Sequence, residues 1–366
     1  MDYVIEGARA VIAGGLEDAS VSVSTGIIAS LDASGSGRRI DGRGLVLAPA
    51  IIDIHGDAFE RQMMPRPGIF FPTEAAILET DRQLAGNGIA TAYHALTLSW
   101  EPGLRSVEHG RALIDGLHKL APRLTVENRV QLRWETFAFE AVDLIREALQ
   151  APLTPALAFN DHTTISMRAI GMPVTERPFA LSAEETASLD DPRLHERCES
   201  AAKRAGLAVA DYVALMGTVW RRRGDVPAMI ETVAQAGNAA GAPMLSHDDT
   251  MPEIREHFSR LGARIAEFPM SEATAHHSRE RGEWSVLGAP NVVRGGSHVK
   301  SLNAADMVQA GLCNILASDY YYPTMLAAIS RMVTERRGTL PVLWELISSN
   351  PAAALGLHDR GRIDPG

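Results

Sequence analysis

Eight strand-like runs of apolar residues alternate with helical patterns along most of this 366-residue chain. The runs lie at residues 50–55, 89–94, 130–137, 155–160, 243–247, 264–268, 286–293 and 315–319. Helical patterns lie near 73–85, 103–121, 140–150, 182–205, 225–240, 252–261, 271–281 and 303–310. Eight βα units are the number that a closed parallel barrel needs. The alternation therefore predicts an α/β fold, a (β/α)8 TIM barrel over residues 49–355.

Residues 1–48 have a different pattern, with short strands expected at 4–12, 21–28 and 45–48 and a loop at 34–44. The alternation Val21-Ser22-Val23-Ser24 is typical of a half-buried antiparallel strand. We therefore predict a small β-sandwich domain at 1–48, completed by part of 356–366. The ending at 361–366 is turn-like, and we expect nothing after it to pair with these strands. Residues 166–181 are predicted to be a long loop, and 323–336 and 341–355 to be closing helices.

Composition narrows the class of protein. With 46% hydrophobic residues the chain can bury a large core, yet no segment reaches the roughly 20 apolar residues that span a membrane. The N-terminus lacks the basic and apolar regions of a signal peptide, and two cysteines are too few for a disulfide framework, so we expect a cytoplasmic protein. The formal charge of −10 argues against nucleic acid as a partner but not against a small phosphorylated substrate. The composition is also compatible with a homodimer.

The carboxyl ends of the predicted strands carry polar residues that suit chemistry. In such a barrel these ends meet at one face, where the active site lies. His55 and Asp57 are two residues apart, so both can project from the end of the first strand, and Gly56 between them permits a close backbone approach. Further side chains at the strand ends are His94, Glu135, Asp161, His162, His247, Asp248, Asp249, Glu267, Asn291 and Asp319.

Each of these residues also has a purely structural interpretation. A His-x-Asp sequence by itself is more often a capped strand end than a metal site, and His94 is more often a core histidine than a ligand. Asp248 and Asp249 precede the helix that starts near Pro252, and we expect one of them to cap it. The succession of such residues over nearly all strand ends favours the functional interpretation.

Imidazole and carboxylate ligands without a thiolate cluster suit Zn²⁺, Mn²⁺ or similar ions. One such ion, or two about 3.5–4 Å apart, activates water near neutral pH and stabilises an in-line displacement. A carboxylate beside that water serves as the general base. We assign this role to Asp319, at the end of the last strand.

Two segments offer groups that bind phosphate. The first is residues 291–298, Asn291-Val292-Val293-Arg294-Gly295-Gly296-Ser297-His298, in which adjacent glycines can present backbone N–H groups to an anion. Arg294, Ser297 and Lys300 add donors, although the segment could also be an ordinary Gly-Gly turn. The second is the proline-stiffened loop that holds Arg61 and Arg66, just after the first strand.

These motifs together resemble the amidohydrolase superfamily and, within it, the PhnM family of α-D-ribose 1-methylphosphonate 5-triphosphate diphosphatases of the carbon–phosphorus lyase pathway. The resemblance covers most of the chain. Its most specific parts are His55-Gly56-Asp57, Met64-Pro65-Arg66-Pro67, Ser246-His247-Asp248-Asp249, the segments 265–269 and 288–298, and Ser318-Asp319-Tyr320-Tyr321. Most amidohydrolases have His-x-His on the first strand, so Asp57 points to PhnM.

The resemblance implies a barrel with a small β-sandwich and a metal centre, with zinc expected. It also implies hydrolysis that releases pyrophosphate from the triphosphate and leaves the 5-phosphate. By position, the implied metal ligands are His55, Asp57, Glu135, His247 and Glu267, and the implied base is Asp319. Residues that would contact the substrate are Arg66, Asp161, His162, Asp249, Asn291, Arg294, Ser297 and His298.

Two alternatives stay open. After Asp161-His162 the chain continues Thr163-Thr164-Ile165-Ser166, where PhnM proteins usually have a Pro-Gly-Gln segment. This difference motivates a second hypothesis, an amidohydrolase that cleaves a C–N bond of a cyclic or acyl amide. A third hypothesis is a non-catalytic scaffold. The nearly complete set of candidate ligands at the strand ends argues against it, because a scaffold does not need them.

Overall fold

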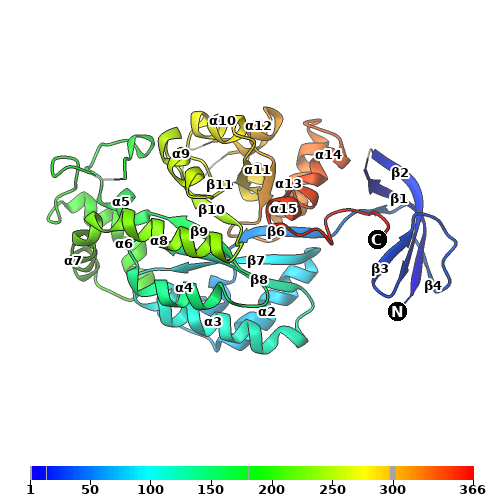
Figure 1. Ribbon diagram of the computed structural model, residues 1–366, viewed down its shortest axis with the longest axis horizontal. Helices are drawn as coiled ribbons and strands as arrows, with labels where there is room; N and C mark the ends of the chain where they lie inside the picture. The colour runs from blue at the N-terminus through cyan, green and yellow to red at the C-terminus, as the bar shows by residue number, and fades with distance from the viewer. Residues whose placement is uncertain (1, 14, 180, 297–301) are drawn as a thin grey trace.

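The large domain is an eight-stranded parallel barrel surrounded by helices (Figure 1). This computed structural model describes residues 2–13, 15–179, 181–296 and 302–366. The strand order is β13-β12-β11-β10-β9-β8-β7-β6, so each strand lies beside its neighbour in sequence. The strands are β6 (Ile51–Gly56), β7 (Ile89–Leu98), β8 (Glu127–Glu135), β9 (Ala156–Asn160), β10 (Met244–His247), β11 (Ile265–Glu267), β12 (Trp284–Gly288) and β13 (Ile315–Ala317). The predicted α/β barrel fold is confirmed.

The first and last strands meet at the carboxyl end of the barrel. Gly56 forms a parallel bridge with Asp319. The N–H of Asp57 donates to the carbonyl of Asp319 at 2.8 Å, and the N–H of Asp319 donates to the carbonyl of His55 at 2.9 Å. The barrel is therefore closed by the backbone of the residues that the sequence singles out for chemistry.

The opposite end of the barrel is closed by a different segment. The N–H groups of Ile52 and Leu316 donate to the carbonyls of residues 347 and 346, each at 2.9 Å, so this segment lies between β6 and β13. Apolar side chains from the strands fill the interior above it, as expected for a packed barrel. They are Ile52, Ile54, Tyr93, Ala156, Ala158, Leu245, Ile265, Val286, Ile315 and Ala317.

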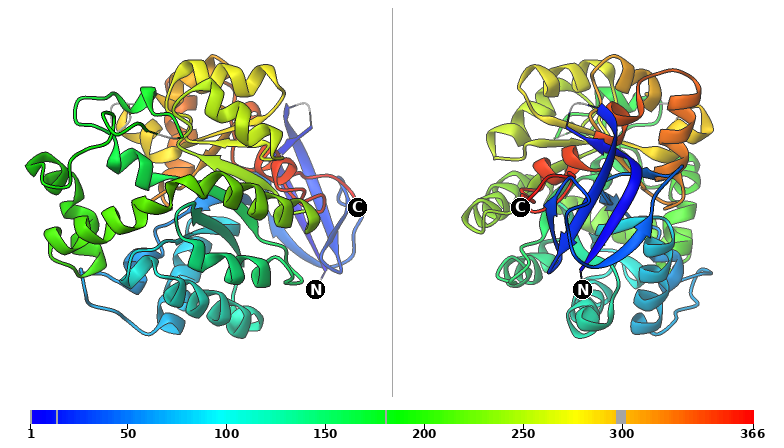
Figure 2. Two further views of the ribbon diagram at one scale, coloured as in Figure 1. Left: turned by 60° about the vertical axis from the view of Figure 1, so that its left-hand side comes forward. Right: turned by 90° about the vertical axis from the view of Figure 1, so that its right-hand side faces the viewer.

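The helices of the first half of the barrel are α1 (Glu60–Met63), α2 (Thr73–Gly86), α3 (Val107–Leu120), α4 (Val142–Ala148), α5 (His162–Met167), α6 (Pro192–Ala205), α7 (Val209–Trp220) and α8 (Val226–Ala239). Those of the second half are α9 (Pro252–Arg260), α10 (Glu272–Glu280), α11 (Ala289–Arg294), α12 (Ala304–Gln309), α13 (Thr324–Thr334), α14 (Leu340–Glu345) and α15 (Ser349–Ala354). Figure 2 shows from two further sides how they surround the strands. Within the described ranges, the helices are all too short or too polar to cross a membrane.

The structure corrects several predicted elements. The strand predicted at 286–293 ends at Gly288 and continues directly as α11, in which Pro290 occupies the first turn, a position that favours helix formation. The predicted helix 341–355 is two helices, α14 and α15. The predicted loop 166–181 begins inside α5, whose N-terminus is capped by Asp161. Helix α7 was not predicted, because apolar residues lie on most of its sides and leave no clear stripe.

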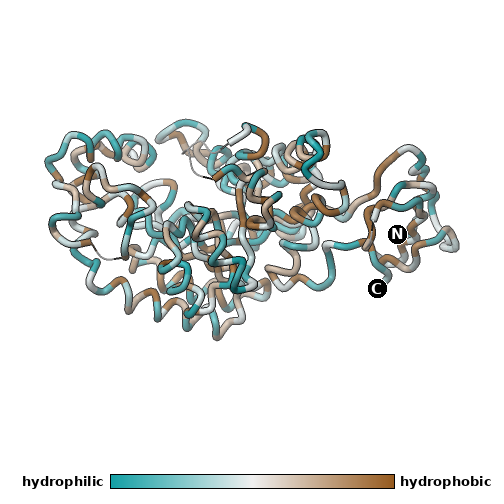
Figure 3. The backbone as a smooth tube through the Cα atoms, turned by 90° about the horizontal axis from the view of Figure 1, so that it is seen from above, coloured by the Kyte–Doolittle hydropathy of each residue, from teal (hydrophilic) through white to brown (hydrophobic). Residues whose placement is uncertain are grey.

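The N-terminal strands form one five-stranded sheet, which stands at one end of the molecule together with both chain termini (Figure 3). Its strands are β1 (Tyr3–Ile12), β2 (Gly15–Ser24), β3 (Ile27–Ser30), β4 (Arg38–Asp41) and β5 (Val46–Leu47). Strand β4 occupies part of the predicted loop 34–44. Ile363 packs with Val21 and Val23, and the N–H of Gly366 donates to the carbonyl of Ile28 at 3.0 Å. The C-terminal residues therefore pack against this sheet.

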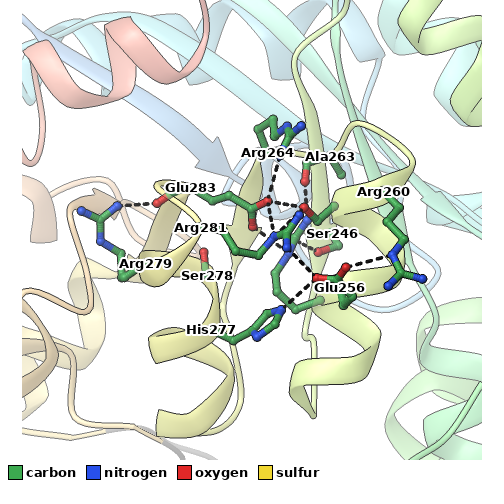
Figure 4. A network of polar contacts seen from close by, with 12 residues as sticks. Ser246, Glu256, Arg260, Ala263, Arg264, His277, Ser278, Arg279, Arg281 and Glu283 are labelled. Atoms are coloured by element: carbon green, nitrogen blue, oxygen red, sulfur yellow. Dashed lines mark hydrogen bonds and ion pairs between the residues drawn. The ribbon is translucent and has the colours of Figure 1, made fainter.

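A buried polar network holds β10 and β11 against α9 (Figure 4). At its centre lies Arg255, which is fully buried. The guanidinium donates to the hydroxyl of Ser246 and lies 3.2 Å from both Asp249 Oδ2 and Glu283 Oε2. Two carboxylates thus neutralise one buried cation directly behind the strand that carries His247.

Candidate active site

Three residues at the barrel mouth have a left-handed backbone. Asp248 follows β10, Phe268 follows β11 and Asp319 lies just beyond β13, with φ angles of 58°, 54° and 55°. Such angles are uncommon outside glycine and cost about 1–3 kcal/mol each, so they persist only where the surrounding structure imposes them. All three residues line one cavity of about 320 Å³, which we call the main cavity. The strained turns therefore direct these side chains into it.

Glu267 joins the two histidines that the sequence placed at different strand ends. Its Oε1 lies 2.9 Å from Nδ1 of His55, and its Oε2 accepts a hydrogen bond of 2.7 Å from Nδ1 of His247. The imidazole rings stack at 5.5 Å, and the ring of Phe268 lies nearly perpendicular to both. Gln131 also donates to Glu267 Oε1, at 2.6 Å. These partners fix the two rings in position.

The two histidines have opposite pKa shifts although both contact Glu267. Burial disfavours the charged form of His55, but the negative charge of Glu267, its hydrogen bond to the ring and the charge of Asp57 together outweigh burial and raise the pKa of His55. Burial and the nearby positive charge of Arg133 lower the pKa of His247 to about 4. His247 is therefore neutral near pH 7, which is the form that binds a metal ion.

Asp57 and Asp319 form a second group with His55. One ligand atom from each of the three residues lies within 4.8 Å of the others. Burial and the negative charge of Asp57 raise the pKa of Asp319 to about 7. A carboxyl group with such a pKa can take up a proton near neutral pH, as a general base must.

The alternation of β6 alone would not place His55 at the cavity, because Ile52 and Ile54 already face the barrel interior. The pairing of β6 with β7 is irregular between Asp53 and Gly56, and such an irregularity redirects side chains. Asp53 is fully buried and accepts hydrogen bonds from the hydroxyl and, at 3.0 Å, from the N–H of Ser318. This interaction connects the irregular segment to the turn that carries Asp319.

Asp248 forms a third group with His162 and His247. Its Oδ2 accepts a hydrogen bond of 3.1 Å from His162 Nε2 and lies 3.5 Å from His247 Nε2. Neither Asp248 nor Asp249 caps α9: the N-cap is Met251, which makes no side-chain capping bond, so the expected cap is wrong.

The donor set fits a divalent cation. Imidazole nitrogens and carboxylate oxygens converge in the three groups, and these ligand atoms suit zinc or manganese. The group of His55, Asp57 and Asp319 fits best, because both ring nitrogens of His247 already have partners. Asp57, the second candidate ligand of the His-x-Asp motif, adds one of the two carboxylates of this group.

Three arginines line the main cavity, and only Arg294 was predicted. Arg133, on β8, is buried, and its Nη2 lies 2.7 Å from His247 Nε2 while its Nη1 lies 3.8 Å from Asp57 Oδ2. Arg105 comes from the 3₁₀ turn at 103–105 and is held by two hydrogen bonds of 2.9 and 3.0 Å to Glu60. Arg133 is two residues from Glu135 on the same strand, so the inward alternation of β8 could have identified it.

Among the described residues, Glu135 belongs to none of the three groups that could hold a metal ion. Its two oxygens accept hydrogen bonds from the Asn160 side chain, the N–H of His162, and the N–H and hydroxyl of Thr163, at 2.7 to 3.1 Å. The carboxylate therefore holds the start of α5. Burial and the charge of Asp161 raise the pKa of Glu135 to about 7.

Two predicted substrate contacts are structural instead. Asp161 caps α5 by accepting from the N–H of Thr164 at 2.9 Å, and Arg177 donates to its other oxygen at 3.0 Å. Asp249 turns away from the cavity into the network around Arg255. Asp248 takes the place at the cavity that the sequence assigned to Asp249.

The two loops that the sequence predicts to bind phosphate are only partly as expected. Arg66 is exposed on its own loop and does not line the main cavity. Asn291 and Arg294 do line it, but Asn291 is engaged with the carbonyl of Leu302 at 2.7 Å and the N–H of Ala304 at 3.0 Å. Ser297, His298 and Lys300 lie outside the described residues.

The Gly295-Gly296 pair ends α11. The N–H of Gly295 donates to the carbonyl of Val292 at 3.1 Å, and that of Gly296 donates to the carbonyl of Asn291 at 2.9 Å. Because Gly295 has the left-handed φ of 80°, this is a helix C-cap. Both N–H groups are occupied, so the expectation that they bind an anion is wrong.

Comparison with known proteins agrees with this fold and these motifs. No protein-family model matches the chain. The chain is 29% identical over 370 residues to the α-D-ribose 1-methylphosphonate 5-triphosphate diphosphatase of Escherichia coli strain K12, covering 99% of this chain and 92% of that protein. The alignment thus includes both domains.

Solved structures with the same fold include several amidohydrolases. A D-hydantoinase from Bacillus sp. AR9 matches with a TM-score of 0.62 at 12% identity, covering 100% of this chain and 84% of that one. An adenosine deaminase from Xanthomonas campestris with bound zinc matches with a TM-score of 0.57 at 14% identity, covering 100% and 82%. The resemblance predicted from the motifs is confirmed: the chain is a relative of the PhnM diphosphatase over nearly its whole length and has the fold of the amidohydrolases.

Proposed function

We propose that this protein is a metal-dependent hydrolase that releases pyrophosphate from the 5-triphosphate of a phosphonate-bearing ribose. The observation that carries the proposal is the composition of the main cavity. Metal-binding groups of His and Asp line it together with Arg105, Arg133 and Arg294. Guanidinium groups recognise phosphate oxygens with charge-assisted hydrogen bonds. The relationship to the E. coli diphosphatase supports the same substrate class.

His55, Asp57 and Asp319 would hold the cation, with His247 and Glu267 beside them. A bound divalent ion supplies Lewis acidity to water and to the phosphoryl group. Either Zn²⁺ or Mn²⁺ suits these donors, as one ion or two. The chain's own residues supply the rest of the chemistry.

Asp319 would accept the proton of the attacking water. Its position on the barrel-closing bridge fixes its carboxylate relative to His55 and Asp57. The water oxygen forms the new bond to the phosphorus nearest the sugar while the bond from that phosphorus to the pyrophosphate oxygen breaks. The arginines stabilise the charge that develops on the departing pyrophosphate.

The experiment is to measure pyrophosphate release from ribose 5-triphosphate compounds with Zn²⁺ or Mn²⁺ present. The wild type should release pyrophosphate above a metal-only control. Asp319→Asn should abolish turnover, whereas Asp143→Asn, whose side chain is 97% exposed on α4, should leave it unchanged. No release by the wild type would refute the proposal.

A panel of amide substrates tests the alternative hypothesis, a hydrolase that cleaves C–N bonds. The wild type should not turn over a panel of cyclic and acyl amides under the same conditions. Amide turnover without pyrophosphate release would establish the alternative, and a protein that retains no metal and shows neither activity would point to the scaffold.

A further inference from the structure

We propose that the sugar of the substrate binds in a second cavity beside the main cavity, which we call the side chamber; this inference rests on the proposed function. The side chamber has a volume of about 290 Å³ and lies among the loops after β7, β8 and β9 and helices α5 to α7. Figure 1 shows these helices at the end of the molecule opposite the small sheet. Arg105 and His162 line both cavities, so the two cavities adjoin at these side chains.

Size requires both cavities. Pockets for small ligands usually measure about 300–1,000 Å³. The main cavity, at about 320 Å³, is at the lower limit, and the candidate metal-binding groups form part of its lining. A sugar joined to three phosphates therefore needs more room than the main cavity offers, and the side chamber is the adjoining space.

The side chamber contains a buried hydroxyl that lacks a partner. Thr97, near the end of β7, is 4% exposed and lines the chamber. Within the described ranges its Oγ1 makes no hydrogen bond, and the same holds for Nε of Arg204 on the chamber wall. An unsatisfied buried polar group costs about 1–3 kcal/mol. A ligand hydroxyl that bonds to Thr97 would remove this cost.

The charged side chains that line the two cavities favour different parts of the substrate. The side chamber has two arginines, Arg105 and Arg204, and two carboxylates, Glu101 and Glu135. Arg204 donates to both oxygens of Glu101, at 2.9 and 3.2 Å, and Tyr212 donates to Glu101 at 2.6 Å. This balance suits a neutral group with hydroxyls.

The main cavity would favour anionic groups over neutral ones once a cation is bound. Its arginines, Arg105, Arg133 and Arg294, are matched by Asp57, Asp248 and Asp319. A divalent ion then makes it positive, so phosphates are favoured there. The triphosphate would lie in the main cavity and the sugar in the side chamber, with His162 and Arg105 at the junction.

The chamber wall also provides aromatic surface for a sugar. The rings of Trp100 and Tyr212 lie 5.4 Å apart with an angle of 39° between them, and both line the chamber. The Trp100 indole is held by a hydrogen bond of 2.9 Å to the hydroxyl of Thr163. A fixed ring can pack against the C–H face of a sugar while hydroxyl groups reach Thr97.

The test compares a ribosyl triphosphate with inorganic tripolyphosphate, which has no sugar. Two variants alter the chamber: Thr97→Val removes the hydroxyl at constant shape, and Met216→Trp fills space at the wall. In each, the ratio of kcat/KM for the ribosyl substrate to that for tripolyphosphate should fall about tenfold or more. Thr334→Val, on the exposed side of α13, should leave the ratio unchanged. An unchanged ratio in both chamber variants overturns the inference.

Calorimetric titration with ribose 5-phosphate separates this inference from the proposed function. The wild type should bind the sugar phosphate more tightly than inorganic phosphate, and Thr97→Val and Met216→Trp should lose this preference. If the wild type hydrolyses neither substrate, the proposed function fails, while the titration still decides where the sugar binds. Equal affinity for the two ligands, or a preference that both variants retain, refutes the side chamber.

Discussion

The guanidinium of Arg133 lies against the imidazole of His247, with Nη2 2.7 Å from Nε2. The same nitrogen of His247 lies 3.5 Å from Asp248 Oδ2, so a cation and an anion both approach one candidate metal ligand. Arg133 is 5% exposed and is further held by Asn160 Oδ1 at 3.3 Å. A permanent positive charge therefore stands where His247 could otherwise bind a metal ion.

Arg133→Met should change metal and substrate binding in opposite directions. Removing the positive charge favours cation binding by the adjacent histidine and carboxylates, so the affinity for Zn²⁺ should rise. Losing a charged hydrogen-bond donor, worth about 1.5–3 kcal/mol, should raise KM about tenfold or more. Competition with a chelator and steady-state kinetics measure the two effects. A parallel loss of both affinities would show that Arg133 acts through folding instead, and Arg146→Met on the surface of α4 is the matched control.

Arg294→Ala should weaken substrate binding far more than metal binding. Arg294 is exposed at the end of α11 and lines the main cavity, whereas it belongs to none of the three metal-binding groups. We expect KM for the triphosphate to rise about tenfold with little change in metal content, measured by elemental analysis. Equal losses of substrate and metal would contradict a role in binding phosphate.

Gly56→Ala should destabilise the barrel at its closing point. A Cβ on Gly56 would lie 2.8 Å from Asp53 Oδ2, 3.0 Å from Ser318 Oγ and 3.1 Å from Tyr322 Cε1. Overpacking of this kind costs about 1–3 kcal/mol. Chemical denaturation should show this loss, whereas Gly86→Ala, at the end of α2 with no neighbouring atoms within 4 Å, should not reduce stability. A Gly56 variant as stable as the wild type would show that this contact is easily relaxed.

Much of the architecture could be predicted because apolar periodicity determines which segments are strands and which are helices. The strand ends then identify His55, Asp57, His247, Glu267 and Asp319 as residues of one face, and all five lie at the main cavity or directly beneath it. Parallel strands make this inference strong, since their carboxyl ends necessarily meet.

The direction of individual side chains could not be predicted in the same way. Asp248 and Asp249 are chemically alike, and the left-handed φ of Asp248 decides that Asp248 faces the cavity while Asp249 faces Arg255. Because non-glycine residues rarely adopt a left-handed backbone conformation, the sequence pattern does not predict it at Asp248. Glu135 likewise has the residue type of a ligand, but the N-terminus of α5 supplies donors that satisfy it.

Acidification should destabilise the protein through His94, which is buried among apolar side chains and does not line the main cavity. Burial lowers the pKa of His94 below its ordinary value of 6.5, against the opposing effects of the bond to Asn128 and the charge of Asp81. The folded state therefore binds fewer protons than the unfolded state below pH 6.5, so the stability is present above this pH and is lost as the pH falls. The loss amounts to at most about 1.4 kcal/mol for each pH unit.

The measurement is the free energy of unfolding of the wild type and of His94→Gln between pH 7.5 and 5.5, in roughly half-unit steps that bracket the ordinary histidine pKa. Gln keeps a polar group that can bond to Asn128 but cannot take up a proton, so the variant should lose less stability on acidification. His276→Gln, on the outer surface of α10 with a side chain 53% exposed, serves as the matched control and should follow the wild type. Parallel pH profiles for the wild type and His94→Gln would exclude His94 as the group responsible, because every other titrating carboxylate and histidine is common to both proteins.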